Sequence, residues 1–181
     1  MKPRSYTSDG IVLARRNFGE ADRILVIFSR NFGRLSLLAR GIRKPKSRKR
    51  GHLEVFSLIN FQATTGRGLD YITEVEMIDD FKDIRTSLNK VSLAYYFAEI
   101  VGRITHDGET NVDLYNLILG YLNQLKKTKK LKDLRMNFIY SLLTTLGFWP
   151  KGKTLTDADQ ILEETIERKV FSQRVGKRMV S

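Results

Sequence analysis

The spacing of apolar residues changes near residue 80, and this change is the feature that most restricts the fold. Before it, five short runs rich in β-branched and aromatic residues occur at 6–14, 24–29, 34–40, 53–64 and 69–78. Turns that contain Gly separate most of these runs, which is typical of β-strands. After it, apolar residues recur every three or four positions, which is typical of amphipathic helices. The sequence therefore predicts an α+β protein with strands first and helices after them.

Five short strands in about 75 residues suit a small closed barrel, and the OB-fold is the commonest such barrel that binds nucleic acid. We expect an OB-fold nucleic-acid-binding domain over 1–80 and an all-helical domain over 81–181. Helices are expected at 83–105, 112–125, 131–146 and 158–171. Asn111 should cap the second helix, Gly147 should end the third, and Thr156 with Asp159 should start the fourth as a capping box.

Positive charge is concentrated in residues 39–51, ARGIRKPKSRKRG. Seven of the eleven residues from Arg40 to Arg50 are Lys or Arg and none is acidic. Such a run repels itself, and Pro45 and the flanking glycines disfavour regular structure, so we expect a loop between two strands. The loop could clamp a phosphate backbone, or it could be a solvated loop or a targeting signal. The predicted DNA-binding residues are Arg30, Arg34, Arg40, Arg43, Lys44, Lys46, Arg48, Lys49 and Arg50.

Two further groups of residues could contact nucleic acid. Barrel aromatics can stack on bases, although a small barrel also needs them in its core; they are Phe18, Phe28, Phe32, Phe56, Phe61 and Tyr71. A second basic cluster lies between the second and third helices, and it is either a solvated connector or a second contact. The residues that would form this second contact are Lys126, Lys127, Lys129 and Lys130.

The overall charge favours a polyanionic partner. The chain carries a net charge of +12, and residues 1–80 contribute +6 of it, so the basicity is not confined to a tail. Nucleic acid is a better candidate than a membrane surface. No apolar run reaches the length of a membrane span and no signal core is present, so we expect a cytoplasmic protein with no membrane contact.

Catalytic and metal-binding patterns are missing from the sequence. There is no cysteine, which excludes disulfides and thiolate zinc sites, and the two histidines are far apart. Asp79 and Asp80 are adjacent carboxylates that more often start a helix than bind a metal. We therefore expect no enzyme activity, no metal site and no cofactor.

The order of several motifs resembles the bacterial DNA repair and recombination mediator family RecO. The matching segments are GIVL at 10–13, GEADRIL at 19–25, ARGIRKPKSR at 39–48, GRGLD at 66–70 and AYYFAE at 94–99. LGFWP at 146–150 resembles a later segment of the same family. Each motif alone is weak evidence for the family. The resemblance depends on their order and spacing along the sequence.

This resemblance implies a fold, a function and a set of partners. Members of the family have an N-terminal OB-fold, a helical domain and often a zinc module. They bind single- and double-stranded DNA, anneal complementary strands and, with RecR, help RecA to displace the single-strand binding protein SSB. The helical domain also binds the acidic, apolar C-terminal tail of SSB. We expect this binding site at Lys130, Lys132 and Arg135.

The chain departs from the family pattern near residues 150–156. Many relatives carry a four-cysteine zinc module there, and this sequence has none. Residues 161–174 resemble the family's C-terminal helix, so the module looks excised, and we expect a short form without zinc. The alternative function is an OB-fold RNA-binding protein that acts on ribosomal or transfer RNA. A nuclease has no support beyond charge.

Overall fold

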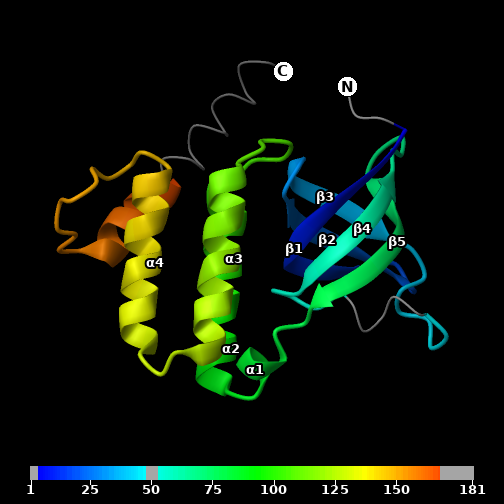
Figure 1. Ribbon diagram of the computed structural model, residues 1–181. Helices are drawn as coiled ribbons and strands as arrows, with labels where there is room; N and C mark the ends of the chain where they lie inside the picture. Colours follow the sequence, from blue (N-terminus) through cyan, green and yellow to red (C-terminus); the bar gives the residue numbers. More distant parts are fainter. Residues whose placement is uncertain (1–3, 48–52, 168–181) are drawn as a thin grey trace.

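The computed structural model describes residues 4–47 and 53–167, and Figure 1 shows a β-barrel beside a group of helices. Five strands close the barrel in the order β1-β2-β3-β5-β4. β3 and β5 are parallel, and the other neighbouring pairs are antiparallel. The strands are β1 (Ser5–Phe18), β2 (Asp22–Ser29), β3 (Gly33–Ala39), β4 (Leu58–Thr64) and β5 (Asp70–Asp79). The predicted α+β fold, with a five-stranded OB-type barrel followed by helices, is confirmed.

The apolar residues form two cores. One lies inside the barrel and contains Ile27, Leu37 and Phe61. The other joins the outer wall of the barrel to the helices and contains Phe28 together with Phe97. Because β2 is covered on both faces, its sequence ILVIF is a continuous apolar run rather than an alternating one.

The predicted strand 53–64 is shorter than expected, since β4 begins only at Leu58. Residues before it form a turn in which Phe56 adopts a left-handed backbone conformation, with φ of 59°. The Phe56 amide donates to the Val12 carbonyl at 2.7 Å, and its ring is fully buried. Packing of side chains in a turn, not strand pairing, therefore explains the apolar character of residues 53–57.

The helices are α1 (Lys82–Arg85), α2 (Leu88–Ile104), α3 (Val112–Lys127), α4 (Leu131–Thr145) and a further helical stretch at 158–167. The predicted single helix 83–105 is wrong, because it is broken at Thr86 and Ser87. Ser87 is extended, with φ of −132°, and precedes the first turn of α2. Both residues have side chains that favour helix ends over helix interiors. Leu88, the first residue of α2, is 81% exposed.

Two of the three predicted helix ends are confirmed. The Asn111 side chain accepts a hydrogen bond from the Leu114 amide at 2.8 Å, and Gly147 is left-handed with φ of 77°. The capping box of Thr156 and Asp159 is wrong, because Asp157 accepts from the Gln160 amide at 3.3 Å. Asp159 instead pairs with Arg135 of α4.

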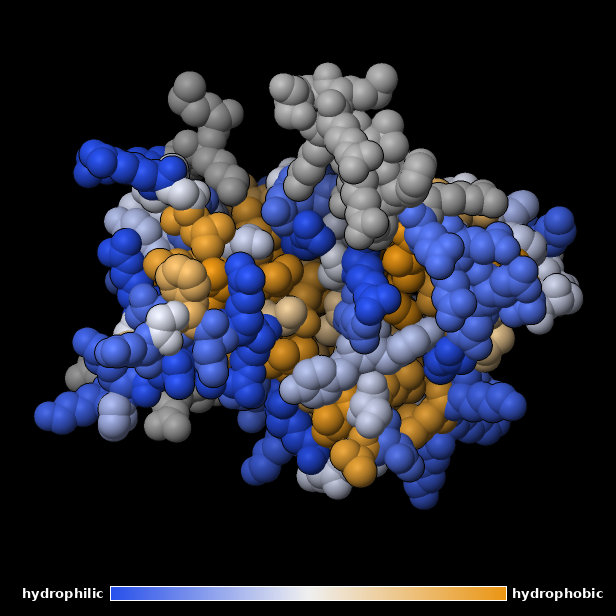
Figure 2. Space-filling model, turned by 180° about the vertical axis from the view of Figure 1, so that it is seen from behind, coloured by the Kyte–Doolittle hydropathy of each residue, from blue (hydrophilic) through white to orange (hydrophobic). Residues whose placement is uncertain are grey.

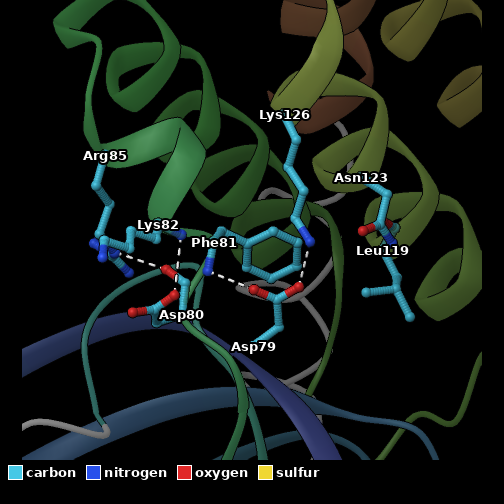
Figure 3. Close-up of polar contacts among 8 residues, drawn as sticks. All are labelled: Asp79, Asp80, Phe81, Lys82, Arg85, Leu119, Asn123 and Lys126. Carbon is cyan, nitrogen blue, oxygen red and sulfur yellow. Dashed lines mark hydrogen bonds and ion pairs between the residues drawn. The ribbon is translucent and has the colours of Figure 1, made fainter.

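Asp79 and Asp80 connect the barrel to the helices (Figure 3). Asp79 accepts a hydrogen bond from the Phe81 amide at 2.7 Å and forms an ion pair with Lys126 of α3. Asp80 accepts from the Lys82 amide at 3.0 Å. The two carboxylates thus start a helix and attach it to α3, and within residues 4–47 and 53–167 no group of three or more acidic or His side chains could hold a metal.

Candidate nucleic-acid interface

β3 separates the predicted DNA-binding residues into two groups. Arg34 lies at its beginning and Arg40 just beyond its end, so about 20 Å of strand separates them. Arg34 is committed to the helices: its Nε donates to Asp107 Oδ1 at 2.7 Å and its Nη1 donates to the Gly102 carbonyl at 2.5 Å. The predicted DNA-binding residues therefore do not all lie at one end of the barrel.

Arg30 belongs with Arg34 at the end of the barrel that faces α3. Burial raises the pKa of the Tyr115 phenol on α3 to about 12; the nearby Asp9 carboxylate adds to the increase and Arg30 partly offsets it. Arg30 is exposed, and its backbone amide donates to the Asp9 carbonyl at 2.9 Å. Both acidic and basic residues therefore lie at this end of the barrel, near Tyr115 of α3.

The beginning of the basic loop is fixed to the turn between β1 and β2. The Gly41 amide donates to Asp22 Oδ1 at 2.7 Å, and the Arg43 amide donates to the Ala21 carbonyl at 2.9 Å. Ile42 is fully buried. Lys44 and Lys46 extend from this anchored base and are exposed. Arg48, Lys49 and Arg50 lie outside the described residues.

The strand register places an aromatic and basic surface on the outside of the barrel. Arg16 pairs with Ile24, Ile24 with Leu38, and Leu38 with Tyr71, so these four side chains share one face. Leu37, on the alternate face of β3, belongs to the interior core, so the shared face is the outer one. Phe18 follows Arg16 by two positions on β1 and lies on the same face.

A hollow of about 550 Å³ opens on this face. Its lining comes from three parts of the barrel: Phe18 at the end of β1, Leu38 and Arg40 around the end of β3, and the turn 65–69 with Tyr71. The Arg40 guanidinium lies 4.7 Å from the centre of the Tyr71 ring. A cation over an aromatic ring is stabilised by the ring's quadrupole, so each side chain helps to position the other.

The turn between β4 and β5 depends on Gly66 and Asp70. A Cβ on Gly66 would lie 2.3 Å from the Leu69 carbonyl oxygen, so a larger residue does not fit there. Asp70 accepts from the Gly66 amide at 3.2 Å and from the Tyr6 hydroxyl at 2.7 Å. The Asp70 carboxylate is thus held inside the turn, while Arg67 beside it is exposed.

Only some of the candidate aromatics can reach a ligand. Phe28, Phe56 and Phe61 are fully buried, and Phe32 packs against Tyr6 with ring centres 4.7 Å apart. Phe18 is 52% exposed, and Tyr71 is half-buried at the hollow. Spacing alone does not reveal this division, because both groups occupy similar positions in apolar runs.

The second basic cluster is divided in the same way. Lys126 pairs with Asp79 and lies 4.7 Å from the centre of the Phe81 ring (Figure 3). The other members, Lys127, Lys129 and Lys130, are exposed around the turn between α3 and α4. Of the residues expected to bind the SSB tail, Lys132 is also exposed, whereas Arg135 pairs with Asp159 and lies 4.9 Å from the centre of the Tyr96 ring. Figure 1 shows this turn at the lower end of the helices, away from the barrel.

The remaining hydrophobic surface is scattered. Figure 2 shows the back of the molecule, where hydrophilic side chains divide the hydrophobic surface into separate patches. Exposed apolar residues away from the hollow include Ile78, Leu88 and Tyr95. No helix in the described part of the chain is both long enough and apolar enough to span a membrane.

A closed barrel in the order β1-β2-β3-β5-β4, followed by helices, defines an OB-fold protein with a helical extension. Residues 1–81 match the family model described as Recombination protein O N terminal, and residues 85–153 match that described as Recombination protein O C terminal. The chain belongs to the RecO family.

Similar proteins carry the corresponding name. A protein from Pelotomaculum thermopropionicum, named DNA repair protein RecO, is 41% identical over 120 residues, which cover 66% of this chain and 47% of that protein. Another of that name from a Roseiflexus species is 32% identical over 176 residues, covering 97% of this chain and 61% of the relative. The chain thus spans about half to three-fifths of the length of these relatives.

Proposed function

We propose that this chain binds DNA on the barrel and promotes annealing of complementary strands in DNA repair and recombination. The observation that supports this most is the position of Phe18 and Tyr71 beside Arg40 and Arg67 on one outer face of the barrel. Cations can neutralise phosphates while aromatic rings contact bases, which is how OB-folds bind single strands. We assign nucleic-acid binding to the barrel domain, residues 1–80, and no catalytic step to any residue.

The wider role that we propose follows the family. The chain would bind single- and double-stranded DNA in the cytoplasm and, with RecR, help to load RecA onto DNA covered by SSB. The SSB tail would contact the turn between α3 and α4, where Lys130 and Lys132 are exposed. Arg135 is a weaker candidate than the sequence indicated, because Asp159 already occupies its guanidinium.

The competing function is RNA binding. The same surface would accept an RNA single strand, because phosphates and base faces are common to both polymers. Competition between DNA and RNA strands of equal length and sequence separates the two functions. A preference for DNA supports a repair role, and a strong preference for RNA favours the alternative.

The test of DNA binding uses two variants with the same change in charge. In the first, Arg40, Lys44, Lys46 and Arg67 at the barrel surface are replaced by Ala. In the control, four exposed cations on the helical side are replaced by Ala: Lys82, Arg103, Lys151 and Lys153. Removing one cation that neutralises a phosphate of a single strand flattens the plot of log affinity against log salt by about 0.7, so removing four flattens it by roughly 3.

The expected result is a flatter salt dependence and slower annealing for the barrel variant, with the control close to the parent. If the control falls as far as the barrel variant, binding depends on net charge and not on this surface. If only substitution of Lys127, Lys129 and Lys130 reduces affinity, the DNA site lies at the turn between α3 and α4.

A further inference from the structure

The hollow on the barrel is lined by apolar and aromatic side chains, Phe18, Leu38, Leu69 and Tyr71, that phosphate binding does not require. We propose that it accepts one unpaired base, which stacks on Phe18 and on the Arg40 guanidinium, and that Phe18 thereby makes the protein prefer single strands to duplexes. This inference rests on the proposed DNA binding and adds a determinant of strand specificity to it.

The exposure of Phe18 is the first argument. Phe28, Phe56 and Phe61 of the barrel are fully buried, whereas Phe18 is 52% exposed beside a concave surface. The ring lies at the end of β1 and is not needed to close either core, since neither core contains it. An aromatic side chain held at the wall of a hollow is available for stacking on a ligand.

The arrangement of Arg40 and Tyr71 is the second argument. Arg40 covers the Tyr71 ring, with Cζ 4.7 Å from the ring centre. Arg40 also lines the hollow, and an Arg guanidinium can stack on bases as well as pair with phosphates. Phe18 lines the same hollow and supplies a second surface for stacking.

Charge and size favour a nucleotide as the occupant. Arg40 and Arg67 line the hollow, while the Asp70 carboxylate nearby is engaged by the Gly66 amide and the Tyr6 hydroxyl. A volume of about 550 Å³ falls within the range of small-ligand sites. Leu38 and Leu69 also line the hollow and add apolar surface that a base could contact.

A duplex cannot use this surface in the same way. Its bases are stacked on one another, and exposing one costs unstacking and unpairing energy. Paired strands therefore present phosphates to Arg40 and Arg67 but no free base face to Phe18. Removal of the Phe18 ring should affect single-strand binding and leave duplex binding unchanged.

The experiment compares Phe18→Leu with the parent on three probes: a single strand, a duplex of the same sequence, and a strand of the same length made of abasic sites. The expected result is roughly tenfold weaker binding of the base-containing strand, equivalent to about 1.4 kcal/mol and within the range for stacking one base. Affinity for the duplex and for the abasic strand should stay within about twofold of the parent, equivalent to about 0.4 kcal/mol. Phe18→Trp should restore the preference for bases.

The control variant is Phe148→Leu, which removes an exposed aromatic beyond the end of α4. It should bind all three probes like the parent. Equal affinity of Phe18→Leu and the parent for the base-containing strand overturns the inference, and so does an equal decrease on all three probes. In both cases the parent still binds DNA, so the proposed function stands. A parent that binds none of the probes overturns both.

Discussion

Arg34 of β3 and Asp107, beyond the end of α2, form an ion pair with 2.7 Å between Nε and Oδ1 although 73 residues separate them in sequence. The same guanidinium also donates to the Gly102 carbonyl. The side chain is 23% exposed, and it joins the barrel to the helices. A residue that sequence reasoning assigns to DNA is thus used for the internal structure of the protein.

Arg34→Ala should destabilise the fold without changing the salt dependence of DNA binding. Removing a charged hydrogen bond to a backbone carbonyl should reduce the free energy of unfolding by about 1.5–3 kcal/mol, measured by urea denaturation. The control is Arg103→Ala, since Arg103 forms an exposed ion pair with Glu99 within α2 and should contribute about 0.3–0.5 kcal/mol. A flattened salt slope in Arg34→Ala with unchanged stability would return Arg34 to the DNA surface.

The number of barrel strands could be predicted, because each strand has a local signal in the sequence. The apolar run at 34–40 and the turn residues around Gly66 need no information from distant parts of the chain. The parallel pairing of Leu38 with Tyr71 is different. It joins β3 to β5, which are neighbours in the barrel but are separated in the sequence by β4, so it has no local signal. The hollow, which depends on that pairing, therefore could not be located from the sequence.

The candidate site could be predicted only in part, because some of its features have a local signal in the sequence and others depend on contacts between distant residues. Charge density identifies the segment around Lys44, and the structure shows this residue exposed. Charge alone does not show that Arg135 forms an ion pair with Asp159 or that Lys126 forms one with Asp79. Cations in ion pairs and cations available to a ligand look the same in the sequence, and only the fold separates them.

Gly33→Ala should lower the melting temperature by disturbing the contact between the barrel and the loop after α2. Gly33 has φ of 67°, and a Cβ there would lie 2.0 Å from the Glu109 carbonyl oxygen. The matched control is Gly19→Ala, where φ is 57° and the added Cβ would have no neighbouring atom within 4 Å. Both variants bear the left-handed strain of about 1–2 kcal/mol, and only Gly33→Ala adds a clash. Equal melting temperatures for the two variants would show that the contact with Glu109 adjusts without cost.

The Tyr115 phenol should make stability fall at high pH. Its ordinary pKa is 10.0, and burial raises the folded-state pKa to about 12. The folded protein therefore holds this proton to higher pH than the unfolded chain does. The contribution to stability is complete below pH 10 and is lost as pH rises toward 12.

Tyr115→Phe should consequently lose less stability than the parent as the pH rises above 10. Urea denaturation at about pH 8 and at about pH 11 measures the difference. Tyr95→Phe, a change at an exposed position on α2, serves as the control and should follow the parent. Parallel curves for Tyr115→Phe and the parent would contradict the assignment.

Metal chelation should leave the protein unchanged. The sequence has no cysteine, and within the described residues no acidic or His cluster could hold a metal ion. Structural zinc normally supplies folding energy, so its removal unfolds a dependent domain. The helical circular dichroism and the rate of annealing should therefore be the same with and without EDTA. A decrease of helical signal in EDTA would reveal a metal site that we do not expect.

The SSB tail should bind at the start of α4. As the family resemblance describes it, the tail is acidic and apolar and ends in a free carboxylate, so its receptor needs cations beside an apolar surface. Lys130 and Lys132 are exposed at the N-terminus of α4, where the helix dipole also favours negative charge, and Leu131 between them is half-buried. Lys130→Glu with Lys132→Glu should weaken binding of a tail peptide.

This double variant leaves Arg135 unchanged, because reversing its charge would also break the ion pair with Asp159 and disturb the packing of α4 on the last helical stretch. Lys151→Glu with Lys153→Glu is the matched control, since it reverses the same amount of charge on an exposed turn. Peptide binding should fall for the first pair by about tenfold, or about 1.4 kcal/mol, and little for the second. Annealing of naked DNA should change equally in both variants, because neither pair lies at the barrel hollow. If naked-DNA annealing falls only for Lys130→Glu with Lys132→Glu, the start of α4 is a second DNA contact and not the receptor for the tail.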